Sequence, residues 1–90
     1  EIIMLERIDG VTRIVTKDEV FQSSASLSDL EAKLNPTEFF RCHKSYIINL
    51  DCISRIEPYG RWTFTVSLKG CSDNALMTAQ NYESLKELFE

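Results

Sequence analysis

Hydrophobic residues recur along this chain mainly with the two-residue period of β-strands, in short runs separated by turn residues. Residues 1–8 and 11–16 are rich in aliphatic and β-branched side chains and flank the pair Asp9-Gly10. This pair accepts the positive φ angles of a tight turn, so the pattern predicts an antiparallel hairpin. After the polar residues 17–19, residues 20–22 predict a short third strand.

The second half of the chain continues this pattern. Residues 53–57 predict a strand and Pro58-Tyr59-Gly60 a turn. Residues 61–68 then alternate, and one face of this predicted strand carries Trp62, Phe64, Val66 and Leu68. A second hairpin follows from this arrangement, and residues 75–78 predict one more short strand after a turn-rich loop.

Two segments have helical spacing instead. In the first, the leucines at 27, 30 and 34 share one helical face. Ser28 and Glu31 fit a capping box at its start, preceded by the apolar Leu27, and Asn35-Pro36 is expected to end the helix. A terminal helix, with Asn81 as its cap, carries an apolar stripe of Tyr82, Leu85, Leu88 and Phe89. The chain is therefore expected to form one mainly β, antiparallel domain over residues 1–90, with one short internal helix and one C-terminal helix.

The segment from Phe39 to Leu50 combines core and surface character. It begins apolar, turns polar and basic from Arg41 to Ser45, and ends on a further apolar run closed by Asn49, which is expected to cap a turn. Two apolar anchors thus hold a cationic, hydrogen-bonding tip that a rigid scaffold can present to a partner. The residues expected in the core are Phe39, Phe40, Tyr46, Ile47, Ile48 and Trp62.

The overall charge is acidic, with a formal net charge of −4 and a pI near 5.0. This counts against a uniformly basic nucleic-acid-binding surface. The cations are nevertheless concentrated in residues 41–62, where Arg41, Lys44, Arg55 and Arg61 outnumber Asp51 and Glu57. A local basic patch around the central segment is therefore compatible with the composition.

Several function classes are disfavoured by what the sequence lacks. A triad of Ser45, His43 and Asp51 has no nucleophile elbow to support it, and no glycine-rich phosphate loop is present, so an enzyme is not expected. Neither a metal nor another cofactor is expected, because adjacent Cys42 and His43 would point to opposite faces of a strand.

Cysteine content and hydropathy indicate where the protein works. Three cysteines with no paired spacing suit a reducing, cytoplasmic environment, and no apolar run is long enough to cross a membrane. Cys42 is either an inert buried thiol or a redox-active one, with Cys71 as its conceivable partner.

Binding is the favoured class of function, and two partners remain open on residue chemistry. Arg41, His43, Lys44 and Ser45 are side chains that contact DNA bases and phosphates. The alternative is a small β module that binds another protein through an edge strand or the central loop.

The segment Phe39-Phe40-Arg41-Cys42-His43-Lys44-Ser45-Tyr46-Ile47-Ile48-Asn49-Leu50 closely resembles the hallmark segment of the LytTR family, the DNA-binding domain of many bacterial response regulators. The resemblance extends over almost the whole chain, including Tyr59-Gly60-Arg61 and Lys69-Gly70. It implies a sandwich of small antiparallel sheets whose loops enter successive major grooves. It also implies dimeric binding to repeated promoter elements, a parent regulator with an upstream receiver domain, and one or two further family strands ahead of Glu1.

Carried over by position, the resemblance places DNA contacts at three sites: the tip near Val11, Thr12 and Arg13, the central tip, where Lys44 takes the position of a contact residue, and a site just before the last helix. At this third site Ala79-Gln80 replaces the family's usual Ser-Arg, which removes a cation. The expected DNA-binding residues are Thr12, Arg13, Arg41, His43, Lys44, Ser45, Arg61 and Gln80.

Overall fold

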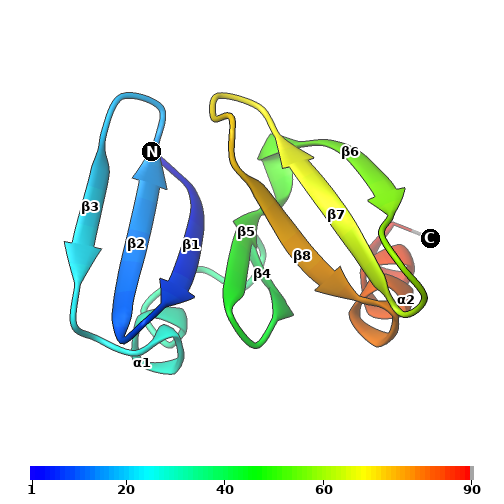
Figure 1. The fold of residues 1–90 in the computed structure, drawn as a ribbon, viewed down its shortest axis with the longest axis horizontal. Coiled ribbons are helices and arrows are strands. Elements are labelled where there is room, and N and C mark those ends of the chain that lie inside the picture. Colours follow the sequence, from blue (N-terminus) through cyan, green and yellow to red (C-terminus); the bar gives the residue numbers. More distant parts are fainter. Residues whose placement is uncertain (90) are drawn as a thin grey trace.

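Two antiparallel sheets of unequal size make up the computed structural model, which describes residues 1–89 (Figure 1). The larger sheet has the strand order β3-β2-β1-β5-β4 and consists of β1 (Ile2–Ile8), β2 (Val11–Thr16), β3 (Val20–Ser23), β4 (Phe39–His43) and β5 (Tyr46–Asn49). The smaller sheet has the order β6-β7-β8, with β6 (Ile53–Pro58), β7 (Thr63–Leu68) and β8 (Asn74–Thr78). The predicted mainly β, antiparallel fold is confirmed.

Both predicted helices are present, but the internal helix ends at Glu31 rather than at Asn35-Pro36, because residues 32–34 form a turn, and the 3₁₀ helix after β5 was not predicted. α1 (Leu27–Glu31) lies between β3 and β4, a short 3₁₀ helix, η1 (Leu50–Cys52), connects the two sheets, and α2 (Ala79–Leu88) follows β8. The Asp9-Gly10 hairpin is also confirmed, since both residues have positive φ angles of 52° and 79° and join the paired strands β1 and β2. Asn49 caps η1 as predicted, because its side-chain oxygen accepts a hydrogen bond of 2.9 Å from the Asp51 N–H.

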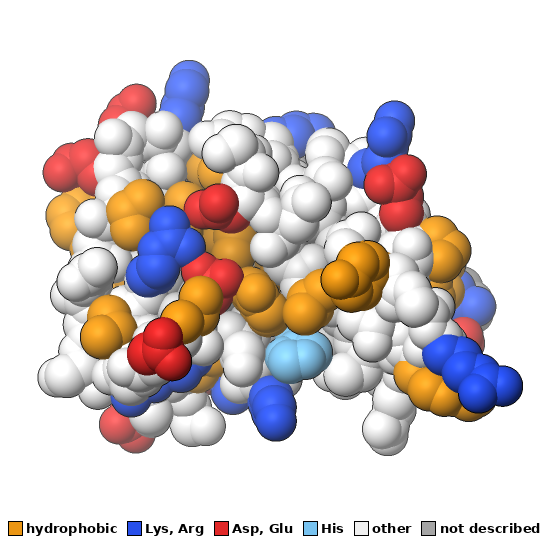
Figure 2. All heavy atoms as spheres, in the orientation of Figure 1, with side chains coloured by type: hydrophobic (Ala, Val, Ile, Leu, Met, Phe, Trp, Pro, Cys, Tyr) orange, Lys and Arg blue, Asp and Glu red, His pale blue; other side chains and the backbone are white. Residues whose placement is uncertain are grey.

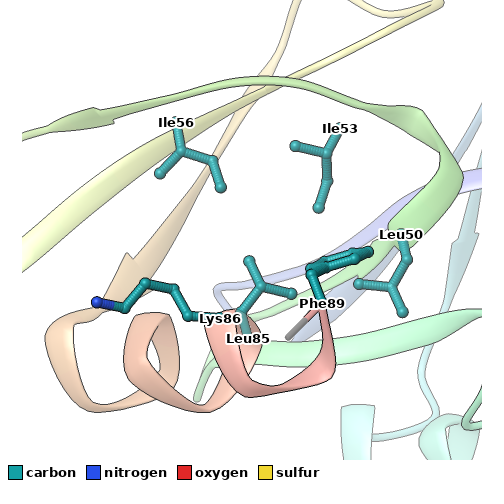
Figure 3. A pocket seen from close by; sticks show the side chains of 6 residues that line it. All are labelled: Leu50, Ile53, Ile56, Leu85, Lys86 and Phe89. Atoms are coloured by element: carbon teal, nitrogen blue, oxygen red, sulfur yellow. The ribbon is translucent and has the colours of Figure 1, made fainter.

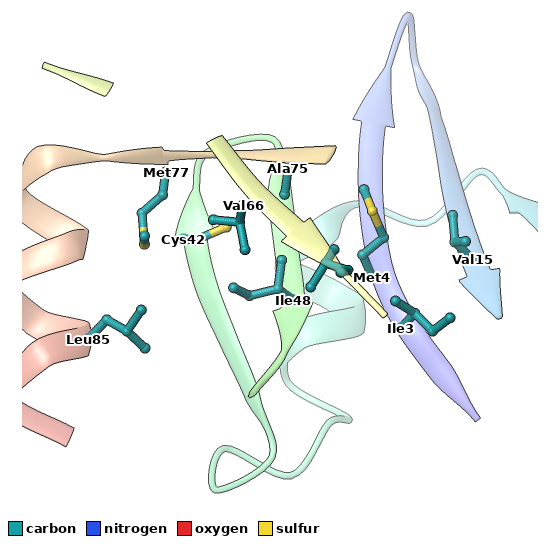
Figure 4. Close-up of a cluster of buried hydrophobic side chains, with 10 residues drawn as sticks. Ile3, Met4, Val15, Cys42, Ile48, Val66, Ala75, Met77 and Leu85 are labelled. Atoms are coloured by element: carbon teal, nitrogen blue, oxygen red, sulfur yellow. The ribbon is translucent and has the colours of Figure 1, made fainter. Parts of the chain in front are cut away.

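A bulge in β1 lets this one strand contribute to two cores. The register with β2 shifts between Ile2 and Met4, so Ile3 and Met4 both face the smaller sheet while Leu5 faces the opposite side. Figure 4 shows the main core between the sheets and α2, formed by Ile3, Met4, Val15, Cys42, Ile48, Val66, Leu68, Ala75, Met77 and Leu85.

The second core lies on the other face of the five-stranded sheet, beneath α1. Leu27 of α1 packs with Leu5 and Ile47, and Leu30 and Leu34 cover the cluster. A helix of five residues is too short to be stable alone, so α1 depends on this packing. The predicted apolar face of the internal helix is therefore confirmed.

Both predicted helix caps are wrong by two or three residues. Ser26, not Ser28, caps α1 by accepting a hydrogen bond of 3.1 Å from Asp29 N–H, and Leu27 is the first helical residue. Thr78, not Asn81, caps α2 by accepting from Asn81 N–H at 3.1 Å. Several polar residues near each start are chemically able to cap, and the end of the preceding strand or loop decides which of them has the required extended backbone.

The side chain of Trp62 was expected in the core, but it is 72% exposed. β7 begins only at Thr63, so Arg61 and Trp62 belong to the β6–β7 loop rather than to the strand. Leu88 and Phe89 are also exposed, so the apolar stripe of α2 is buried only through Tyr82 and Leu85. The remaining expected core residues are confirmed as buried or packed against the two clusters: Phe39, Phe40, Tyr46, Ile47 and Ile48.

Candidate nucleic-acid interface

The cationic tip of the central segment is a tight hairpin end between β4 and β5. Lys44 and Ser45 form the turn, which is narrower than the five-residue tip expected from the sequence. Arg41 lies beneath the turn and donates hydrogen bonds to the carbonyl oxygens of His43 and Lys44, at 3.0 and 2.6 Å, and to Glu31 of α1 at 2.8 Å. The guanidinium of Arg41 is therefore engaged within the domain, where it holds the turn in shape.

His43 stabilises the same turn from the other side. Its Nδ1 accepts a hydrogen bond of 3.0 Å from the Ser45 N–H, and its ring meets Tyr46 edge-on with centroids 5.6 Å apart. An accepting Nδ1 requires the neutral ring with its proton on Nε2. Burial lowers the pKa of His43 below its ordinary value, and the neighbouring cations Lys44 and Arg41 lower it further. At neutral pH the ring is therefore uncharged and fixed in one tautomer.

A pH titration should reveal this arrangement. Because the folded-state pKa of His43 lies below 6.5, the unfolded chain takes up the proton first as the pH falls. The stabilising contribution of the neutral ring is complete above about pH 6.5 and is lost as the pH falls through the folded-state pKa. Urea denaturation at pH 7.5 and 5.0 should therefore show a larger loss of stability for the wild type than for His43→Gln. Equal losses would contradict the lowered pKa of His43 in the folded domain.

Lys44 is the exposed residue of the turn. None of the ion pairs formed within residues 1–89 involves its ammonium group. Its backbone, in contrast, is held through the carbonyl that accepts from Arg41, and the Ser45 carbonyl accepts from Arg7 N–H at 2.9 Å. The turn thus presents a free cation from an ordered backbone.

The β1–β2 tip does not present the two residues expected there. Thr12 is fully buried: its hydroxyl donates to Ala25 carbonyl at 2.7 Å and accepts from Arg7 at 2.8 Å. Arg13 lies opposite Glu6 in the β1–β2 ladder, where it pairs with that carboxylate and with Asp73, 3.2 Å away in the β7–β8 loop. These two acids raise the pKa of Arg13, and its side chain is only 30% exposed. Both residues are part of the internal architecture.

The start of α2 and the β6–β7 loop form one continuous corner. Ala79 N–H donates a hydrogen bond of 2.9 Å to the Trp62 carbonyl, which extends the β7–β8 ladder beyond Thr63 and Thr78. Gln80, the second residue of α2, is exposed, as is Arg61 in the loop. The sequence pattern missed that Tyr59 and Trp62 are exposed at the same corner. One feature of the sequence could have indicated this exposure. The turn Pro58-Tyr59-Gly60 comes directly before Arg61 and Trp62, so these two residues could belong to the loop and β7 could begin after them.

These features gather at one edge of the molecule. Figure 1 shows the β1–β2 tip, the β4–β5 tip, the β6–β7 loop and the start of α2 along its lower edge. In Figure 2 the only histidine of the chain, coloured pale blue, is visible near the centre of that edge. Of the residues predicted to contact DNA, the structure brings His43, Lys44, Ser45, Arg61 and Gln80 to this edge, hereafter the turn edge. Thr12, Arg13 and Arg41 are engaged inside the domain.

An open apolar groove lies between β6 and α2 (Figure 3). Its lining consists of Leu50, Ile53, Ile56, Leu85, Lys86 and Phe89. Lys86 is the only ionisable side chain among these, so the groove lacks the pairs of acids, bases or nucleophiles that catalysis uses.

Residues 1–89 contain no group of three or more metal-ligating side chains. They also contain no helix that is long and apolar enough to cross a membrane.

The three cysteines are free thiols. Cys42 is completely buried, its Sγ lies 3.2 Å from the Leu76 carbonyl, and burial raises its pKa to about 12. A buried thiol with a raised pKa reacts slowly with oxidants, because the thiolate is the reactive form. The geometry therefore favours Cys42 as a small core residue over Cys42 as a redox handle.

Comparison with known proteins gives a consistent result. The profile of the LytTr DNA-binding domain family matches residues 1–90. The transcriptional regulatory protein NatR of Bacillus subtilis (strain 168) is 35% identical over 89 residues, which are 99% of this chain and 38% of NatR. The transcriptional regulatory protein LytR of Staphylococcus aureus (strain N315) is 37% identical over 60 residues, 67% of this chain and 24% of LytR. The chain thus spans less than two fifths of either relative.

A solved structure agrees in fold. The LytTr DNA-binding domain of a putative methyl-accepting/DNA response regulator from Bacillus cereus superposes with a TM-score of 0.83, at 25% sequence identity, and the match covers 98% of this chain and 80% of the other.

Proposed function

The chain belongs to the LytTr DNA-binding domain family, and on this basis we propose that its turn edge reads double-stranded DNA in a sequence-specific manner. The observation that carries the proposal is the β4–β5 tip, which holds Lys44, a cation that forms no ion pair within residues 1–89, on a backbone fixed by Arg41 and His43. A contact residue held on an ordered backbone loses less conformational entropy on binding than one on a mobile loop.

The turns, rather than a helix, are the elements suited to enter the major groove. α2 is the longer helix, but Tyr82 and Leu85 pack it onto the sheets. Its exposed side carries Glu83 and Glu87, which phosphates would repel. The longest dimension of the domain is 32 Å, close to the roughly 34 Å of one turn of B-DNA. Turns spread along an edge of that length match the spacing of successive major grooves on one side of a duplex.

Each residue of the turn edge has a chemical role in this proposal. Lys44 donates to guanine O6 and N7 or to a phosphate, and the Nε2–H of neutral His43 donates to a nearby acceptor. Gln80 offers an amide suited to the N6 and N7 atoms of adenine, where the family's usual arginine would select guanine. Arg61 contacts a phosphate, and Ser45 supports the turn beside Lys44.

The parent regulator adds to what the domain does alone. Relatives such as NatR and LytR are named as transcriptional regulatory proteins, and this chain matches only part of each. We therefore propose a cytoplasmic regulator in which a receiver domain controls dimerisation, so that two copies of this domain occupy repeated promoter elements. Linking two weak sites gives avidity without new contacts, which suits a domain whose turn edge relies on Lys44 and Arg61 for its positive charge.

Selection from a pool of random duplex DNA tests the proposal. Enrichment of a repeated motif is the expected result, with binding that weakens steeply as salt rises. Two phosphate-neutralising cations per domain, Lys44 and Arg61, predict a slope of log K against log salt of about −2 per domain. No enriched motif, together with a salt-insensitive interaction with a protein, would instead identify a protein-interaction module.

A further inference from the structure

The only tryptophan of the chain lies on the surface, in the β6–β7 loop. Trp62 is 72% exposed and Tyr59, in the same loop, is 62% exposed. Two exposed aromatic side chains in one short loop offer a large apolar area together with an indole N–H and a phenol O–H, and such rings are common where proteins meet a partner. Arg61, in the same loop, is an exposed cation.

Trp62 takes no part in the aromatic packing at the main core, whereas Phe64 and Tyr82 do. Phe64, the second residue of β7, stacks on Tyr82 of α2 with ring centroids 4.2 Å apart. The ammonium of Lys86 lies 5.2 Å from the centre of the Tyr82 ring. Phe64 and Tyr82 thus close the end of the main core, and the indole at position 62 lies outside it.

The backbone of Trp62 is nevertheless held in place. Its carbonyl accepts from Ala79 N–H at 2.9 Å, and the loop is closed by a hydrogen bond of 2.8 Å from Tyr59 N–H to the Thr63 carbonyl. Because Ala79 precedes Gln80, the indole is attached at the same corner as the Gln80 amide. Trp62 is therefore a fixed part of the turn edge.

The chemistry of this corner suits the sugar–phosphate strand of a duplex. An indole has a broad apolar face that packs against deoxyribose and one N–H that donates to a phosphate oxygen. Arg61 supplies a charge-assisted partner for the next phosphate. Residues 59–62 contain no carboxylate. Glu57, before the loop, lies 3.7 Å from Arg55, and Glu83, one turn after Gln80 on α2, lies 3.3 Å from Lys86, so each acid has a cation beside it. In Figure 2, which has the orientation of Figure 1, side chains of Lys or Arg (blue) lie against hydrophobic ones (orange) at the lower right, where Figure 1 shows the β6–β7 loop.

We propose that Trp62 and Arg61 form a clamp on the DNA backbone beside the groove segment contacted by Gln80, with the indole packed on deoxyribose and its Nε1–H donated to a phosphate. This inference rests on the proposed function of the turn edge. The clamp positions the domain and reads no base, so it acts equally on specific and non-specific duplexes.

Intrinsic fluorescence provides a direct test, because all tryptophan emission of the chain comes from residue 62. The 90-residue chain is titrated with the duplex recovered by selection and with a scrambled duplex of the same length. Acrylamide should quench the free protein efficiently, and either duplex should protect the indole at saturation. This measurement needs no mutation, so it does not depend on how a variant folds.

Substitutions complete the test. Trp62→Ala should weaken binding to both duplexes by about tenfold to a hundredfold, the loss expected for one hydrogen bond to a charged group. Phe89→Ala is the matched control, since Phe89 is also an exposed aromatic residue, 70% exposed, but lies at the far end of α2. The Phe89→Ala variant should bind both duplexes with the affinity of the wild type. Thermal denaturation of each variant checks that the fold is retained.

Three outcomes would overturn the clamp. If the wild type binds DNA but acrylamide quenches the complex as strongly as the free protein, the clamp is wrong while the proposed function stands. If the indole becomes protected without DNA as the protein concentration rises, Trp62 contacts a second copy of the chain instead. If neither duplex is bound, the proposed function fails and the clamp with it.

Discussion

Replacing Lys44 with alanine is expected to weaken binding of the selected duplex by about 1–3 kcal/mol, the range for loss of a good side-chain contact to a base edge. The effect should be this large because the ammonium group is exposed at the turn edge and forms no ion pair within residues 1–89. Its side chain forms no hydrogen bond or ion pair within residues 1–89, so the stability of the domain should be unchanged. Fluorescence anisotropy with a labelled duplex measures the affinity.

Lys17→Ala is the matched control for Lys44→Ala. It removes the same exposed charge from the β2–β3 turn, which Figure 1 shows at the edge opposite the turn edge. If Lys44→Ala loses affinity only for the selected duplex, Lys44 contacts a base. A loss shared with a scrambled duplex, together with a salt slope reduced by about 1, would identify it as a phosphate contact. Affinity equal to that of the Lys17→Ala variant would exclude Lys44 from the interface.

Replacing Arg13 with alanine is expected to lower the free energy of unfolding by about 1–3 kcal/mol. Glu6 is only 7% exposed, and its carboxylate is satisfied by Arg13 on one oxygen and by the Tyr46 hydroxyl, at 3.0 Å, on the other. Without Arg13 a buried carboxylate keeps a single donor, which is costly in a low-dielectric environment. The partial exposure of Arg13 keeps the loss below that of a fully buried pair.

Urea denaturation of three variants checks this prediction. Arg55→Ala is the control, because Arg55 and Glu57 are both exposed and lie 3.7 Å apart, so its effect should be within about 0.5 kcal/mol. Adding Glu6→Gln to Arg13→Ala should recover part of the loss, since a neutral amide is less costly to bury than a carboxylate. If Arg13→Ala destabilises the domain no more than Arg55→Ala does, the pair with Glu6 does not stabilise the fold.

The contrast between Lys44 and Arg13 shows why the candidate site was only partly predictable. Both are cations near predicted turns, and sequence reasoning treated both as DNA contacts. Arg13 meets Asp73, sixty residues away, and Arg41 meets Glu31 of α1, whereas Lys44 has no such partner within residues 1–89. Whether a cation is free depends on which acids the fold brings to it, and these pairings are remote in sequence.

The local pattern was reliable wherever neighbouring residues decide the structure. Alternation located the strands, and Asp9-Gly10 located a turn because its φ angles are set by local sterics. It was unreliable at boundaries: the strand predicted to begin at residue 61 begins at Thr63, and this difference of two residues moves Trp62 from an expected core position to the surface.

By itself, then, the sequence determined the strands, the turns, the two helices and the family, because these depend on short-range backbone preferences and on a long, distinctive central segment. Only the tertiary structure decided which polar side chains remain free for a partner. Thr12, Arg13 and Arg41 satisfy groups inside the domain, while Lys44, Gln80 and Trp62 stay at the turn edge. The physical reason is that a buried polar group must be paired, and its partner is supplied by whichever distant segment packs against it.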